Sequence, residues 1–141
     1  MNKSQVHLKP LKLSLSKKIT VIFFLLLISL GTTSVAQQRN ISKGVYTEAQ
    51  AILGKEVYDT NCKTCHAMKF YRDIWFAWEE RPLMNFWYIL VSEMPSDNPG
   101  SLSNDEYTNI VAYILSDLDF PAGDVPLDPS NEMEGITIAP F

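Results

Sequence analysis

The sequence contains little cysteine and little histidine, with two of each among 141 residues. Two cysteines are too few for a disulfide-stapled mini-protein, a four-cysteine zinc site or a multi-cluster iron–sulfur protein. The chain also lacks a basic excess, because its formal net charge is -4, so the composition does not favour nucleic-acid binding. No internal repeat is visible, which excludes a solenoid. With 46% hydrophobic and 20% charged residues, the composition indicates one small globular domain.

The first 36 residues have the order of a secretory signal peptide. Five lysines and no acid occupy residues 1–18, an apolar run follows from Ile19 to Leu30, and small residues end at Ala36. This order predicts cleavage after Ala36 and a periplasmic location for the rest of the chain. An uncleaved membrane anchor is the alternative, although the run of about 12 residues is shorter than the roughly 20 needed to span a bilayer.

Cleavage after Ala36 changes the charge balance of the remaining chain. It removes five of the 12 basic residues and none of the 16 acidic ones, so seven against 16 gives a net charge of −9. It also removes His7 and leaves His66 as the single histidine. We expect a lead-in over residues 37–46, a folded domain over 47–117 and an extended tail over 118–141.

Helix signals in the domain predict an all-α fold with three to four helices. Two capping boxes, at Thr47 to Gln50 and at Ser103 to Glu106, predict helices over about 48–60 and 104–117. A third helix is expected to begin near Pro82 and to end at Met94, because the following Pro95 disfavours helical geometry before it. Residues 67–81 are rich in aromatic side chains and follow no regular pattern, and the tail is expected to hold a short strand near residues 135–138.

The segment Cys62-Lys63-Thr64-Cys65-His66 has the spacing of a c-type haem attachment sequence. Two thiols one helical turn apart match the spacing of the two porphyrin vinyl groups, so Cys62 and Cys65 can form two thioethers. The adjacent His66 can then present its imidazole to the iron from the same side. The motif therefore predicts one covalently bound haem c.

Other readings of the two cysteines fit the sequence less well. A thioredoxin-like pair follows a strand and opens a helix, whereas Cys62 and Cys65 come at the end of a predicted helix. A zinc site needs about four ligands, and the chain after residue 36 offers two cysteines and one histidine. A structural disulfide is the simplest alternative for an exported protein.

The second axial ligand of such a haem has to be something other than histidine, and methionine is the soft alternative. Met68 lies too close to His66 to cross the haem plane, Met84 falls within a helix where packing explains it, and Met133 is expected to be exposed in a polar tail. Met94 follows His66 by 28 residues at a helix exit and is held by Pro95. We therefore predict His66 and Met94 as the iron ligands, with ordinary packing as the alternative role for Met94.

Together these segments resemble the class I c-type cytochromes, most closely the periplasmic mono-haem kind associated with quinoprotein and other dehydrogenases. The resemblance covers most of residues 44–123. Its matching segments are the helix start at Gly44–Ala51, Gly54 with Tyr58, Cys62–His66, Met94-Pro95, Pro99–Ser103, Tyr107 with Ile110–Leu115, and Phe120–Gly123.

The resemblance implies a crossing of the first and last helices, with Gly54 and Tyr58 against Ile110 and Tyr113. It also implies that Met94 is the distal methionine and that the adjacent Pro95 lies at the cofactor. A tryptophan before the methionine helix often bonds a haem propionate in the family, and Trp78 is our choice, with Trp75 second. Residues 67–81 lack the proline that usually follows the histidine, so the partner that orients the His66 imidazole stays unassigned.

The function implied is single-electron transfer by a carrier that is not itself an enzyme. Its expected partners are a periplasmic dehydrogenase as electron donor and an oxidase or another cytochrome as electron acceptor. No nucleic-acid partner is expected, and contact with the membrane is expected only if the leader stays uncleaved. Two alternatives remain open. One is a tightly bound cytochrome subunit of a dehydrogenase, with the aromatic stretch between Phe70 and Tyr88 as its contact surface. The other is a gas-binding or sensor haem, which requires an open iron position.

Overall fold

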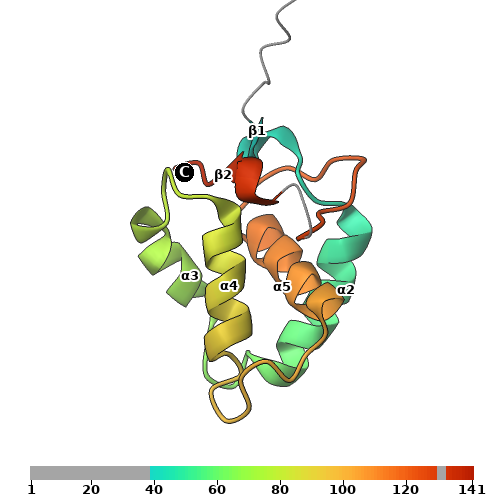
Figure 1. Ribbon diagram of the computed structural model, residues 1–141, viewed down its shortest axis with the longest axis vertical. Helices are drawn as coiled ribbons and strands as arrows, with labels where there is room; N and C mark the ends of the chain where they lie inside the picture. Colours follow the sequence, from blue (N-terminus) through green and yellow to red (C-terminus); the bar gives the residue numbers. More distant parts are fainter. Residues whose placement is uncertain (1–38, 130–132) are drawn as a thin grey trace, which may run out of the picture. The chain divides into compact units, whose positions relative to one another are not determined.

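The computed structural model describes residues 39–129 and 133–141, and the fold in this part is mostly helical, as predicted. Its four α-helices are α2 (Glu48–Asn61), α3 (Met68–Ile74), α4 (Leu83–Glu93) and α5 (Asn104–Asp117) (Figure 1). Short elements complete the order, namely β1 (Arg39–Asn40), η1 (Ile41–Lys43), η2 (Trp75–Ala77), η3 (Met133–Gly135) and β2 (Ile136–Thr137). The predicted signal peptide over residues 1–36 and its cleavage site lie outside the described residues.

None of the helices in the described part combines the length and the hydrophobicity that crossing a membrane requires.

Helices α2 and α5 begin at the two capping boxes that the sequence contains. The Thr47 hydroxyl accepts from the Gln50 backbone N–H at 3.3 Å, and the Gln50 side chain accepts from the Thr47 N–H at 3.2 Å. Ser103 and Glu106 make the same reciprocal pair at the start of α5. Each box satisfies amide groups that have no partner within the helix, so both helix starts are fixed by local sequence.

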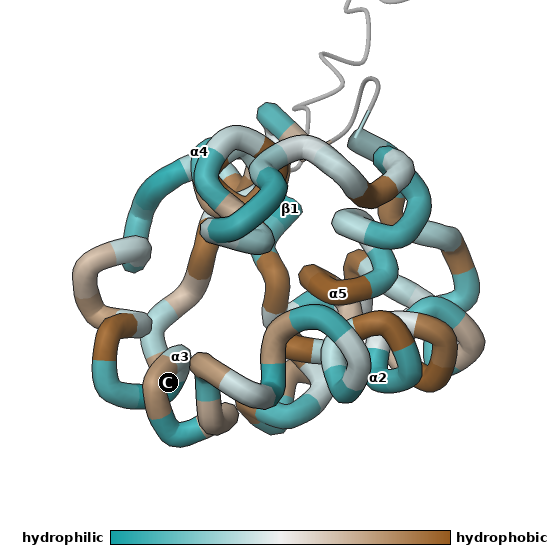
Figure 2. The backbone as a smooth tube through the Cα atoms, turned by 90° about the horizontal axis from the view of Figure 1, so that it is seen from below, coloured by the Kyte–Doolittle hydropathy of each residue, from teal (hydrophilic) through white to brown (hydrophobic). Residues whose placement is uncertain are grey.

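The two capped helices pack directly against each other, and Figure 2 shows hydrophobic segments in both. Gly54 lies at their closest approach, where an added Cβ would overlap the Asn109 carbonyl and lie 3.0 Å from the Ile110 amide nitrogen. Four residues further along α2, the Tyr58 ring lies 5.2 Å from the Tyr113 ring of α5. The contact of Gly54 and Tyr58 with Ile110 and Tyr113 that the family resemblance implied is therefore present.

Helix α4 begins after Pro82, as predicted, and ends at Glu93, with Met94 as its C-cap at the predicted helix exit. It packs on α5, and the buried Trp87 indole N–H donates to the Thr108 hydroxyl at 3.1 Å. The Met94–Pro95 peptide bond is cis, and Met94 has extended backbone geometry, with φ −123° and ψ 150°. The chain thus leaves the helix at the methionine and enters the loop to α5.

The interpretation of residues 67–81 as irregular is wrong for most of this stretch, because residues 68–77 form α3 and η2. Helix α3 has no side-chain cap and is only seven residues long, so its start carries no local signal. It forms because Tyr71 and Trp75 are buried against the other helices. The Trp75 ring contacts Phe86 of α4, with 5.7 Å between the ring centroids.

The lead-in and the extended tail, which were expected to lie outside the folded domain over 47–117, both contribute to the core. Ile41 and Val45 are fully buried, and β1 pairs in parallel with β2, with Arg39 opposite Ile136. The expectation that Met133 is exposed is wrong, since its exposed fraction is 0%. The predicted short strand is present at β2, and the tail closes over the ends of the helices because it brings apolar side chains to them.

Replacing Gly54 with alanine tests the closest helix contact. Alanine favours an isolated helix by about 1 kcal/mol over glycine, but the added methyl group would overlap the Asn109 backbone. We predict that Gly54→Ala lowers the free energy of unfolding by about 2 kcal/mol or more, measured by chemical denaturation. Gly135→Ala is the matched control, because nothing lies within 4 Å of a Cβ at Gly135. Equal stability of the two variants would contradict the contact.

Candidate functional site

The segment Cys62 to His66 forms one tight turn at the end of α2. The Cys62 N–H donates to the Tyr58 carbonyl at 2.9 Å, and Cys62 is the C-cap of the helix. The Cys62 carbonyl then accepts from the Cys65 N–H at 3.1 Å and from the His66 N–H at 2.9 Å. The turn therefore places Cys62 and Cys65 one helical turn apart, with His66 directly after Cys65, the spacing that attachment of a haem by two thioethers requires.

Met94 lies at the C-terminal end of α4 and is held by hydrogen bonds at both of its backbone polar groups. Its N–H donates to the Leu90 carbonyl at 3.0 Å. Its carbonyl accepts from the Tyr107 hydroxyl at 2.5 Å and from the Gly100 N–H at 3.4 Å. Helix α4 and helix α5 thus fix the methionine from two sides.

One pocket brings five of the six predicted site residues together. Its cavity volume is about 60 Å³. Cys62, Cys65 and His66 line it from the end of α2, and Met94 and Pro95 line it from the end of α4. In Figure 1 the end of α2 and the loop after α4 lie at the same lower end of the helices. The remaining lining residues are Asn61, Tyr71, Leu90, Ser96, Asp97, Leu102, Tyr107 and Ile110.

Aromatic side chains surround His66. The imidazole lies 4.8 Å from the Phe70 ring and 6.1 Å from the Tyr71 ring, centroid to centroid. The backbone carbonyl of His66 accepts a hydrogen bond from the Tyr58 hydroxyl. Burial raises the pKa of Tyr58 to about 12, partly opposed by a hydrogen bond with Tyr71, so this hydroxyl stays a donor at neutral pH.

The environment of the cysteines disfavours thiol redox chemistry. A reactive cysteine pair needs a lowered thiol pKa, which helix N-termini and nearby cations provide. Cys62 lies instead at the C-terminal end of α2, and burial raises the pKa of its thiol. Cys65 is exposed, and the two thiols form no disulfide with each other. The turn therefore presents two free thiols at a pocket, an arrangement suited to thioether formation.

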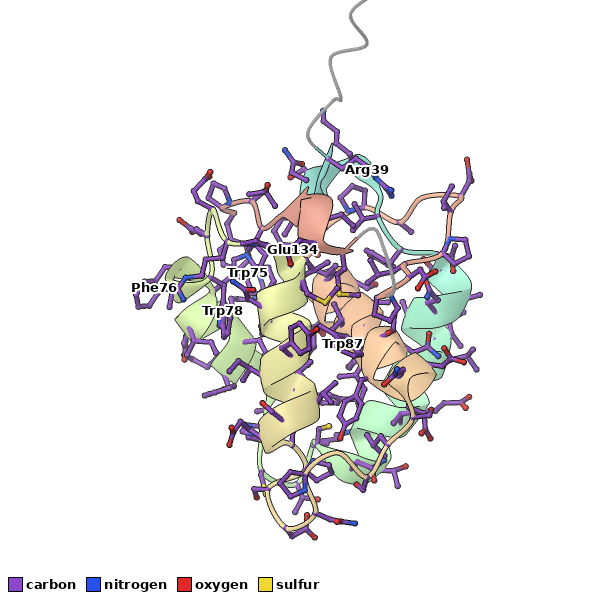
Figure 3. The ribbon with its side chains drawn as sticks, viewed as in Figure 1. Arg39, Trp75, Phe76, Trp78, Trp87 and Glu134 are labelled. Carbon is purple, nitrogen blue, oxygen red and sulfur yellow. The ribbon has the colours of Figure 1, made fainter. Side chains whose placement is uncertain are left out.

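The two tryptophans considered for a contact with a haem propionate are not among the residues that line the pocket. Both pack on Phe86 of α4, between α3 and α4 (Figure 3), with ring centroids 5.7 Å away for Trp75 and 5.1 Å for Trp78. The Trp75 indole N–H donates to the Ala139 carbonyl at 3.1 Å, which makes it the weaker choice. Trp78 lies under the Arg81 guanidinium, 5.9 Å from the ring centroid, and its propionate role stays a prediction.

Sequence reasoning missed the two tyrosine hydroxyls that hold the backbone of His66 and Met94. Tyr58 and Tyr107 were each noted as matching a family position, but neither was assigned a hydrogen bond. A hydroxyl that donates to a backbone carbonyl has no partner side chain, so no residue pair in the sequence could reveal it. The regular apolar spacing in α5, which predicts burial of Tyr107, was the only signal available.

The residues at the pocket fit a haem c group. Two thiols, an imidazole nitrogen and a thioether sulfur make up the donor set that covalent attachment and axial ligation require. Leu90, Leu102 and Ile110 add apolar surface for a porphyrin face. Across residues 39–129 and 133–141, no three or more His, Cys, Asp or Glu side chains gather as a metal site of another kind.

Comparison with known proteins gives one family match. Residues 49–114 match the family model described as cytochrome c oxidase, cbb3-type, subunit III. The matched segment runs from the first turn of α2 through the Cys62–His66 turn and Met94 to the last turns of α5. Neither a curated protein nor a solved structure gives a significant match.

Proposed function

The chain carries a class I c-type cytochrome domain and is a haem-based electron-transfer protein, and on this premise we propose that it is a periplasmic mono-haem carrier with His66 and Met94 as axial ligands. The convergence of the two cysteines, His66 and Met94 on one pocket carries this proposal. Haem c supplies the one-electron chemistry of its iron, and the protein supplies attachment, ligands and surroundings. The charge and burial of the neighbouring residues decide how electrons reach it.

Each residue at the pocket has a separate task in this proposal. Cys62 and Cys65 form the two thioethers, which keep the haem attached in a compartment outside the cytoplasm. His66 binds the iron from the side of α2, and its backbone is held by Tyr58. Met94 would supply a second ligand, a thioether that raises the reduction potential relative to a second histidine. With both ligands supplied by the protein, the iron would bind no substrate.

The charge distribution supports a basic partner that docks near Met94. No lysine, arginine or histidine follows Arg81 in the sequence, whereas Glu93, Asp97 and Asp105 flank the loop between α4 and α5. Asp97 lines the pocket itself, and it is exposed. Ion pairs of Lys55, Lys63, Lys69 and Arg72 lie on α2, α3 and the turn between them. Among the described residues, the lining of the pocket thus includes the carboxylate of Asp97 and no lysine or arginine.

A second candidate function is that of a tightly bound subunit of a dehydrogenase. The observation that favours it is the set of large hydrophobic side chains left exposed on α3, η2 and α4. Phe76 is 74% exposed and Tyr88 is 58% exposed, in the stretch that the sequence predicts as a contact surface. Such side chains suit a protein interface. A complex with a dehydrogenase that persists at nanomolar concentration would support this function over a freely diffusing carrier.

Serine substitution of the two cysteines tests covalent attachment. We predict that the wild type, matured with haem, keeps the haem under denaturing conditions, as measured by intact mass. Each of Cys62→Ser and Cys65→Ser should retain it through one thioether, and the double variant should lose it. A wild type that releases its haem on denaturation would contradict the attachment.

Substitution of Met94 tests the sixth ligand. We predict that the ferric wild type shows the weak long-wavelength sulfur-to-iron band and that the ferrous form does not react with carbon monoxide. Met94→Ala should lose the band and bind the gas, because the side chain that blocks the position is gone. Met84→Leu is the control, since Met84 is buried in α4 outside the pocket. A wild type that binds carbon monoxide readily would favour a gas-binding or sensor role instead.

The acidic loop predicts a salt dependence of electron transfer. With a basic protein partner, the bimolecular rate should fall by about tenfold between 10 and 200 mM salt, because salt screens attraction between charged surfaces. Asp97→Asn should weaken this dependence on salt. Glu134→Gln should not, because Glu134 lies near the end of α4 that is opposite the Met94 loop (Figure 3). The rate with a neutral small-molecule reductant serves as the reference and should stay constant. A salt-independent rate with the protein partner would argue against this docking surface.

A further inference from the structure

Met94 lies at the start of a loop whose hydrogen bond to it, from the Gly100 N–H to the Met94 carbonyl at 3.4 Å, is long. The loop that follows it is exposed from Ser96 to Ser101. The backbone hydrogen bonds within this loop are short-range turns, such as Asn98 N–H to the Pro95 carbonyl at 2.9 Å. Exposed turns of this kind open easily, because few buried contacts oppose the motion. A ligand at the start of such a loop needs an anchor from another element.

Tyr107 provides that anchor from the first turns of α5. Its side chain is 1% exposed and lines the pocket. Its hydroxyl donates to the Met94 carbonyl at 2.5 Å, the shorter of the two hydrogen bonds that this carbonyl accepts. Its own N–H donates to the Ser103 carbonyl at 3.0 Å, within the capped helix start. The hydroxyl therefore connects the loop methionine to a fixed helical turn.

The helix that carries Tyr107 is itself held in place on two sides. Asn109, two residues further along, lies in backbone contact with Gly54 of α2. Thr108 accepts the buried hydrogen bond from Trp87 of α4. Tyr107 thus lies next to the points where α5 contacts α2 and α4. A displacement of Met94 away from the pocket would have to break the Tyr107 hydrogen bond.

We propose that Tyr107 is a positioning residue for the sixth iron ligand, with its hydroxyl holding the Met94 backbone so that the sulfur faces the pocket. This inference rests on the proposed function, in which Met94 binds the iron. A typical hydrogen bond of this kind shifts an equilibrium by about three- to tenfold. Loss of the hydroxyl should therefore favour replacement of the sulfur by an external ligand by about this factor.

Imidazole binding to the ferric, haem-loaded protein measures that replacement. Imidazole competes with the sulfur for the iron, so its apparent affinity rises when the methionine is held less firmly. We expect Tyr107→Phe to bind imidazole about three- to tenfold more tightly than the wild type, with a corresponding weakening of the sulfur-to-iron band. Chemical denaturation of each variant, run in parallel, ensures that the comparison is made on folded protein.

Two control variants separate positioning from a general loss of stability. Tyr46 is equally buried, and its hydroxyl donates to the Phe120 carbonyl at 2.6 Å, away from the pocket lining. Tyr46→Phe removes an equivalent hydrogen bond and should lower stability without changing imidazole affinity. Thr108→Val removes the other hydrogen bond between α4 and α5 and should also leave that affinity close to the wild-type value.

The outcomes distinguish this inference from the function on which it rests. A wild type with the sulfur-to-iron band, together with increased imidazole affinity in Tyr107→Phe alone, supports the inference. A wild type with the band but equal imidazole affinity in Tyr107→Phe and Tyr46→Phe overturns the inference and leaves the proposed function standing. A wild type without the band overturns the Met94 ligation and the inference together.

Discussion

The contact between α2 and α5 at Gly54 is the constraint on which the site depends. With no side chain at Gly54, the backbone of α2 can lie against the Asn109 carbonyl of α5. This close approach fixes the two helices that carry the site's tyrosine anchors. Tyr58 on α2 donates to the His66 carbonyl, and Tyr107 on α5 donates to the Met94 carbonyl. Both predicted iron ligands are therefore tied to one pair of helices, although they lie far apart in the sequence.

The site combines ligands that are anchored to helices with a loop that is exposed to solvent, and this combination suits electron transfer. The turn from Cys62 to His66 and the end of α4 form the two sides of the pocket, and each is anchored by hydrogen bonds to a helix. The loop after Pro95 stays exposed and acidic, where a partner can approach. A site that only relays electrons gains from this arrangement, because its ligands need to move little while its surface has to remain accessible.

Local signals allowed most of the fold and most of the site to be predicted from the sequence. The capping boxes at Thr47 and Ser103 and the turn of Cys62 to His66 depend on neighbouring residues, and the structure has each of them. Met133 was predicted to be exposed, and this was wrong because its burial depends on long-range contacts. One such contact is the pairing of β1 with β2, which come from opposite ends of the domain's sequence. Helix α3 was missed because Ala67 provides no side-chain cap and tertiary packing stabilises the helix instead. The tyrosine anchors escaped prediction because their partners are backbone carbonyls.

A crystal structure of the matured, haem-loaded protein tests the central claim most directly. Our account predicts the iron between the imidazole nitrogen of His66 and the sulfur of Met94. It also predicts that the Tyr58 and Tyr107 hydroxyls keep their bonds to the carbonyls of these two ligands, with the backbone of Gly54 still against that of Asn109. An iron bound by a different sixth ligand, or helices α2 and α5 separated at Gly54 while the ligation is intact, would contradict it.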